Sequence, residues 1–129
     1  MSENQIKRFK WESLLTRDEL EDRISKNERI STVNTSLIYD MHELFMGDSF
    51  FNQPLNNWDV SKVDSMMCMF WKAIRYKGTM KNWKLKQDCN TDSLLLNVYT
   101  WHLFNTVEDL PMQNGKRIDI GDRKTWKLL

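Results

Sequence analysis

The chain has 129 residues, and its 19 basic and 18 acidic side chains leave a formal net charge of +1. This balance excludes a general electrostatic attraction to nucleic acid or to an anionic membrane, so such a partner would have to recognise a local patch. The length and the 40% of hydrophobic residues favour one domain. No long apolar run is present, which predicts that the chain has no membrane span. The lack of an apolar N-terminal signal predicts an intracellular, cytoplasmic location.

The first predicted element is a helix within residues 6–29. Thr16 followed by Glu19 is the capping-box pattern, in which the two side chains satisfy free backbone N–H groups at the start of a helix. Leu15 before the cap and Leu20 after it are placed to form a hydrophobic staple. The balanced charges of this segment indicate a solvated helix face rather than a binding site.

A repeat of 25 residues follows this helix. Its clearest pairs are Met41 with Met66, Phe45 with Phe70, and Trp58 with Trp83. A period of this length is typical of stacked coils such as leucine-rich repeats, in which apolar side chains point inward at equivalent positions of successive coils. The residues predicted to form the core are Phe45, Phe51, Leu55, Trp58, Val63, Met66, Phe70, Met80 and Trp83.

Two further elements are predicted toward the end of the chain. The apolar run from Leu94 to Trp101, with Leu103-Phe104 as an optional extension, favours a helix with Asp92 as its N-cap. Asn114-Gly115 lies between two short runs that contain apolar residues, and this dipeptide predicts a tight hairpin.

The predicted fold class is α+β, a short leucine-rich-repeat-like solenoid of two to three coils in a single domain. Residues 1–32 are expected to form a helical N-terminal cap, residues 33–90 the repeat coils, and residues 91–129 a C-terminal cap of helix and hairpin. Caps are needed because the open ends of a coil stack would expose apolar layers and unpaired strand edges. Within the coils, the expected strands are 53–58 and 78–83, and the expected helical turns are 41–46 and 65–72.

The sequence FNQPLNNWDVSKV, residues 51–63, followed by an MxxMF pattern that ends at Phe70, resembles the repeat of the BspA-like surface-protein family, a relative of leucine-rich repeats. The resemblance extends over residues 33–86. It implies adhesion or protein binding over an extended face, and family members occur on cell surfaces and among proteins of large DNA viruses. The second repeat departs from the signature, because YKGTM at residues 76–80 replaces FNQPL and keeps core residues while losing surface ones.

No constellation of catalytic, metal-binding or cofactor-binding residues is recognised, so we expect a protein that is not an enzyme and has no cofactor. His42 and His102 lie far apart in the sequence and are expected to have packing or surface roles. Cys68 and Cys89 are both expected to be free thiols with a buried packing role, and Cys68, among methionine and phenylalanine residues, is expected to be inert. The four glycines do not cluster into a phosphate loop, and the acidic residues between positions 30 and 70 lack the alternation of a calcium loop.

The candidate partner-binding surface is the basic stretch WKAIRYKGTMKNWKLK, residues 71–86, which contains six basic side chains and no acidic one. Basic groups neutralise phosphates while aromatic rings stack on bases, so nucleic-acid binding through this stretch is the alternative function. The repeat assigns Tyr76 and Trp83 to the interior, however, which favours a basic face for an acidic protein partner. The candidate residues are Lys72, Arg75, Lys77, Lys81, Lys84 and Lys86.

We therefore expect a non-catalytic protein–protein interaction module, most concretely a small accessory or structural subunit of a larger assembly. If the source is a large DNA virus, the assembly would be the virion. The expected partners are proteins, and nucleic acid is the less favoured partner.

Overall fold

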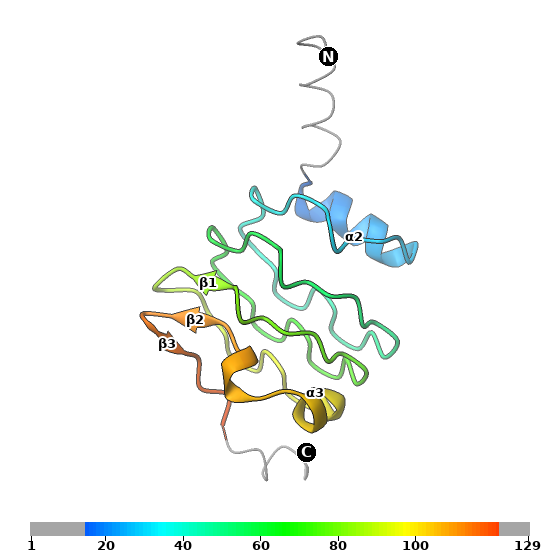
Figure 1. Ribbon diagram of the computed structural model, residues 1–129. Helices are drawn as coiled ribbons and strands as arrows, with labels where there is room; N and C mark the ends of the chain where they lie inside the picture. Colours follow the sequence, from blue (N-terminus) through cyan, green and yellow to red (C-terminus); the bar gives the residue numbers. More distant parts are fainter. Residues whose placement is uncertain (1–14, 122–129) are drawn as a thin grey trace.

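The structure is a computed structural model that describes residues 15–121 (Figure 1). Residues 6–14 of the predicted helical segment 6–29 and the outer parts of the two predicted caps lie outside the described residues. In chain order the elements are α2 (Arg17–Ser25), β1 (Lys84–Leu85), α3 (Tyr99–Phe104), a 3-10 turn (Val107–Asp109), β2 (Met112–Gln113) and β3 (Lys116–Arg117).

The predicted leucine-rich-repeat-like solenoid with helical caps is wrong. Regular secondary structure in residues 15–121 amounts to two α-helices, one 3-10 turn and a three-stranded mixed sheet, in which β1 pairs with β2 in parallel and β2 pairs with β3 antiparallel. The strands expected at 53–58 and 78–83 do not form, because Pro54 has no backbone N–H to donate and a turn interrupts each segment. The nearest strand begins only at Lys84.

Tight turns replace the helical turns expected at 41–46 and 65–72. Glu43 and Cys68 both have a φ of 57°, a left-handed conformation that a right-handed helix does not contain. The apolar spacing in these segments therefore reflects inward-facing positions of a turn and not one face of a helix.

The helix α3 is shorter than the apolar run predicts. It begins at Tyr99 and not after Asp92, because Ser93 and Asn97 have φ values of 56° and 63° and keep the preceding backbone out of the helical region. Val98 stands at the N-cap position and makes no side-chain capping hydrogen bond.

The N-cap of α2 and the last hairpin are confirmed, whereas the capping box is only half formed, because the Glu19 carboxylate accepts from the Thr16 hydroxyl and not from its backbone N–H. Thr16 is the N-cap of α2, and its hydroxyl accepts a hydrogen bond from the backbone N–H of Glu19 at 3.3 Å. Asn114 and Gly115 have φ values of 55° and 76°, as a type I′ turn requires, and they connect the antiparallel strands β2 and β3.

Three segments separated by the 25-residue spacing lie side by side at the centre of the molecule (Figure 1). We call residues 40–47, 65–72 and 90–97 the turn segments. Left-handed backbone recurs at the same two positions in each of them. The fourth residue of each turn segment is Glu43, Cys68 or Ser93, and the last residue is Gly47, Lys72 or Asn97.

Backbone hydrogen bonds join the turn segments in parallel register. The N–H of Met41 donates to the carbonyl of Ser65 at 2.9 Å, and the N–H of Met66 donates to the carbonyl of Asn90 at 2.7 Å. Both rows continue at every second residue along the segments. Residues about one repeat apart are therefore neighbours in space, as the sequence spacing predicts, although their backbone is neither strand nor helix.

Aromatic rings stack inside the turn segments and the corners that follow them. The ring centroids of Phe45 and Phe70 are 5.4 Å apart, and those of Phe51 and Tyr76 are 5.9 Å apart. Within each repeat the rings are closer, with 3.9 Å between Phe45 and Phe51 and 4.0 Å between Phe70 and Tyr76. These four rings form a continuous stack through the core.

The predicted core residues are confirmed. All nine are buried, and they belong to one apolar cluster that also includes residues of α2 and α3. Trp58 and Trp83 occupy equivalent places, because the indole Nε1 of Trp58 donates to the carbonyl of Ile30 and that of Trp83 to the carbonyl of Leu55, each at 2.8 Å.

We expect Trp58→Ala and Trp83→Ala each to lower the free energy of unfolding by about 3–5 kcal/mol, because each leaves a cavity and an unpaired carbonyl in the core. Urea denaturation followed by circular dichroism measures this loss. Tyr39→Ala, at an exposed aromatic residue, is the control and should change stability by less than about 0.5 kcal/mol. Near-neutral values for both tryptophan variants would contradict their equivalent role.

Candidate functional site

The structure divides the residues of the predicted basic face. Lys84 begins β1, which lies on the opposite side of the molecule from α3 in Figure 1. Lys86 forms ion pairs with Asp64 and with Asp88, the second at 3.6 Å, and the hydrogen bond to Asp64 raises the pKa of Lys86. Lys86 is therefore already engaged by carboxylates of its own chain. Of the six, the exposed ones are Lys72, Arg75, Lys77, Lys81 and Lys84.

Arg75 and Lys77 lie against exposed aromatic rings. The Arg75 Cζ atom is 5.0 Å from the centroid of the Phe50 ring, and the Lys77 Nζ atom is 5.0 Å from the centroid of the Phe104 ring. At these distances a cation is attracted to the negative face of the ring. Phe50 and Phe104 are nonetheless 77% and 68% exposed, so each ring keeps most of its surface in contact with water.

Hydrogen bonds connect the three segments that carry these residues. The Thr100 hydroxyl, in α3, lies 2.7 Å from the carbonyl of Ile74 and 2.9 Å from that of Tyr76. The side-chain carbonyl of Asn52 accepts a hydrogen bond from the backbone N–H of Lys77 at 3.0 Å. We define the aromatic–basic surface by its exposed residues on these segments, which are Phe50, Ile74, Arg75, Lys77, Leu103 and Phe104.

Tyr76 supports this surface from inside the molecule. The Tyr76 ring is buried, although its two neighbours in the sequence, Arg75 and Lys77, are exposed. Burial raises the pKa of the Tyr76 phenol far above its ordinary value. A Cβ atom at Gly78 would lie 2.8 Å from the Tyr76 hydroxyl, so only glycine leaves room for the ring. The carbonyl of Gly78 accepts a hydrogen bond from Trp101 Nε1 at 2.9 Å, which fixes α3 beside the surface.

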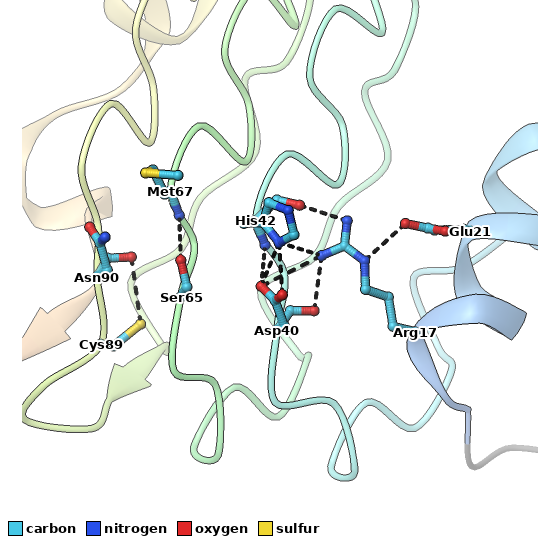
Figure 2. Close-up of polar contacts among 8 residues, drawn as sticks. All are labelled: Arg17, Glu21, Asp40, His42, Ser65, Met67, Cys89 and Asn90. Carbon is cyan, nitrogen blue, oxygen red and sulfur yellow. Dashed lines mark hydrogen bonds and ion pairs between the residues drawn. The ribbon is translucent and has the colours of Figure 1, made fainter.

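A second polar cluster joins α2 to the first turn segment (Figure 2). The Arg17 guanidinium donates to the backbone carbonyls of Asp40 at 3.2 Å and His42 at 2.6 Å, and it pairs with Glu21 at 2.9 Å. The His42 ring lies 2.7 Å from the Asp40 carboxylate. Partial burial opposes ionisation of Asp40, but hydrogen bonds from the His42 backbone and ring outweigh it and lower the pKa of this carboxyl.

The position of Arg17 indicates a structural role. In the second turn segment, the equivalent carbonyls of Ser65 and Met67 accept N–H groups from the first turn segment. The carbonyls of Asp40 and His42 have no preceding turn segment to supply such donors, and the guanidinium supplies them instead. The cluster therefore closes an open backbone edge and does not resemble a catalytic arrangement.

The described residues offer little for metal or thiol chemistry. Within residues 15–121, no group of three or more His, Cys, Asp or Glu side chains is placed to hold a metal ion. Cys68 and Cys89 are both free, but Cys68 is only partly buried, so the prediction of a buried Cys68 is wrong. Cys89 is buried, and burial raises the pKa of its thiol to about 11, which keeps it protonated. No helix in this part of the chain is long and apolar enough to cross a membrane.

Comparison with family models gives one match, over residues 3–105, to the family described as "Mycoplasma protein of unknown function, DUF285". The chain belongs to this family. Comparisons with curated proteins and with solved structures find no match. The DUF285 match includes the three turn segments, α3 and all six residues of the aromatic–basic surface, while the β2–β3 hairpin lies beyond it.

Three functionally placed residues escaped the sequence analysis of this DUF285 chain, namely Phe50, Phe104 and Arg17. The repeat contained a signal for Phe50, because the buried Phe51 aligns with the buried Tyr76, and its neighbour Phe50 must then face outward. Phe104 lies beyond the clear repeats, and the pairing of Arg17 with distant carbonyls has no local sequence signal.

We expect Gly78→Ala to lower the free energy of unfolding by about 1–3 kcal/mol, because the added methyl group overlaps the Tyr76 hydroxyl. Tyr76→Phe is the matched control, since this hydroxyl is buried and has no hydrogen-bond partner among the described residues. Its removal should be neutral or slightly stabilising, and the double variant should recover part of the Gly78→Ala loss in a urea-unfolding cycle. Strictly additive effects would show that the two groups do not meet.

We expect Arg17→Met to lower the free energy of unfolding by about 1–2 kcal/mol, because the methionine keeps the aliphatic packing but leaves two backbone carbonyls without donors. Arg23→Met is the control on the same helix, where the arginine makes only a 4.0 Å ion pair with Glu28. Thermal unfolding measures both. Equal effects of the two substitutions would argue against the edge-closing role.

Proposed function

We propose that this chain is a non-catalytic protein–protein interaction module that serves as a small accessory or structural subunit of a larger assembly. The observation that carries the proposal is the aromatic–basic surface, where Phe50 and Phe104 expose their rings beside cationic side chains. Large exposed apolar groups gathered in one place mark interaction sites, and aromatic and arginine residues are enriched among the residues that dominate binding energy.

The sequence resemblance supports the same direction. We propose that the repeat in residues 33–86 is a divergent relative of the BspA-like surface-protein repeat, a family whose arrays imply protein binding. The DUF285 match covers this repeat, and its description assigns no function. The proposal therefore depends on the residues of the surface and on the repeat signature together.

The aromatic residues favour a protein over a nucleic acid as the partner. Tyr76 and Trp83, the rings that the basic stretch would have offered to bases, are fully buried. The exposed rings of Phe50 and Phe104 each already have a cation close to the ring centroid. The aliphatic side chains of Ile74 and Leu103 beside them suit protein side chains, because they cannot stack on bases.

The proposed binding residues are fewer than the predicted basic face. Arg75 and Lys77 belong to the aromatic–basic surface, and Lys72 holds its Nζ atom 4.9 Å from the ring centroid of the neighbouring Trp71. Lys84 and Lys86 are excluded, the first by its place in β1 and the second by its ion pairs.

Copurification from the native source tests this function. The double variant Phe50→Ala/Phe104→Ala should retain about tenfold less of any partner that the unaltered chain retains, because both anchors are truncated. The double variant Leu37→Ala/Tyr39→Ala, which removes two exposed apolar side chains outside the surface, is the control and should retain the partner.

Two outcomes would contradict the proposal. One is equal retention by the Phe50→Ala/Phe104→Ala variant and by the unaltered chain. The other is loss of the retained material on nuclease treatment, which would identify nucleic acid as the partner.

A further inference from the structure

Beside the aromatic–basic surface there is a small hollow between the end of α2 and the corner after the first turn segment. It has a volume of about 110 Å³. Its apolar walls come from Ile24, Ile30, Phe50 and Phe51. An enclosed apolar cavity of about 150 Å³ holds one benzene molecule, so this hollow has room for a single aliphatic side chain.

Two of the polar residues that line the hollow, Gln53 and Asn52, are already engaged in hydrogen bonds. The Gln53 side chain accepts a hydrogen bond from the N–H of Ile30 at 2.8 Å and donates one to the carbonyl of Glu28 at 2.9 Å. The side-chain carbonyl of Asn52 accepts the N–H of Lys77. An incoming group therefore meets the apolar walls and, beside them, the side chains of Asn27 and Asp48.

Phe50 connects this hollow to the cations of the surface. One side of the residue lines the hollow, and the guanidinium of Arg75 lies over its ring. Asn52, which also lines the hollow, is hydrogen-bonded to the backbone of Lys77. An occupant that fills the hollow therefore lies beside the Phe50 ring that carries the Arg75 guanidinium and beside the residue that holds the Lys77 backbone.

Arg75 and Lys77 are available for new ion pairs. Among residues 15–121, neither side chain lies within 4.0 Å of a carboxylate, whereas Lys86 is paired with Asp64 and Asp88. Asp48 lines the hollow and carries a negative charge, so it disfavours a carboxylate on its own side. Negative groups of an occupant are directed toward Arg75 and Lys77.

We infer that the partner presents an acidic segment in which one aliphatic side chain fills the hollow beside Phe50 while flanking carboxylates pair with Arg75 and Lys77. This inference rests on the proposed function and names the chemistry of the partner. The apolar anchor supplies affinity, and the carboxylates supply orientation and a faster association rate.

A short peptide in which one leucine is flanked by glutamates tests the inference, with the full chain labelled with ¹⁵N and chemical shifts followed by NMR. We expect saturable shifts at residues of the hollow and of the aromatic–basic surface. Replacing the leucine by glycine, or the glutamates by glutamines, should weaken binding about tenfold, a factor equivalent to about 1.4 kcal/mol.

Charge-reversal variants supply the matched control. Arg75→Glu/Lys77→Glu should weaken binding of the acidic peptide about tenfold at about 0.1 M salt, whereas Lys81→Glu/Lys84→Glu, which changes the net charge equally, should weaken it less than about twofold. All four side chains are exposed, so the fold should tolerate both pairs of substitutions.

Equal losses in the two pairs, shifts away from the hollow, or no shifts at all would overturn the inference. Failure here with partner retention still dependent on Phe50 and Phe104 would reject the acidic segment and leave the interaction function standing. Failure of both experiments would reject the proposed function as well.

Discussion

Rows of backbone hydrogen bonds between the turn segments are the interaction on which the rest of this structure depends. Each row joins residues about one repeat apart, and together the rows keep three pieces of irregular backbone parallel. Left-handed residues that are not glycine, such as Glu43 and Cys68, cost energy that a lone turn would not recover. The neighbouring segments recover it, because the same bend lets each N–H reach a carbonyl and directs apolar side chains to one interior.

The stacked rings in that interior determine what the surface presents. Phe51 and Tyr76 lie one above the other in the core, so the residues beside them in the chain, Phe50 and Arg75, meet on the outside. The close approach of Gly78 to the Tyr76 ring and its hydrogen bond to Trp101 then bring α3 to the same place. The positions of the exposed aromatic rings and cations therefore follow from the stacking of the buried rings beside them in the chain.

At the first turn segment, the rows of backbone hydrogen bonds end on a side chain. At the first turn segment, the Arg17 guanidinium takes the place of missing N–H donors and ties α2 to the backbone through the carbonyls of Asp40 and His42. Outside these rows, in the segment that precedes the third turn segment, β1 pairs with β2, which continues into the hairpin with β3. The match to the DUF285 family includes the first of these features and stops before the second.

The sequence by itself determined the repeat spacing, the core residues, the N-cap at Thr16 and the turn at Asn114–Gly115. The cap and the turn depend on side chains that are close in the sequence. The spacing and the core depend on the strict 25-residue recurrence of large apolar residues. The sequence misled on the fold class, because apolar spacing does not reveal the left-handed residues that exclude strands and helices from the turn segments. It also grouped six basic residues without revealing that one of them, Lys86, is engaged in ion pairs with Asp64 and Asp88. Only the tertiary structure decided that Arg75 lies over the Phe50 ring, that Lys77 lies over the Phe104 ring, and that Arg17 reaches Asp40. These contacts join residues about one repeat apart, so they depend on how the layers pack, which no local sequence pattern records.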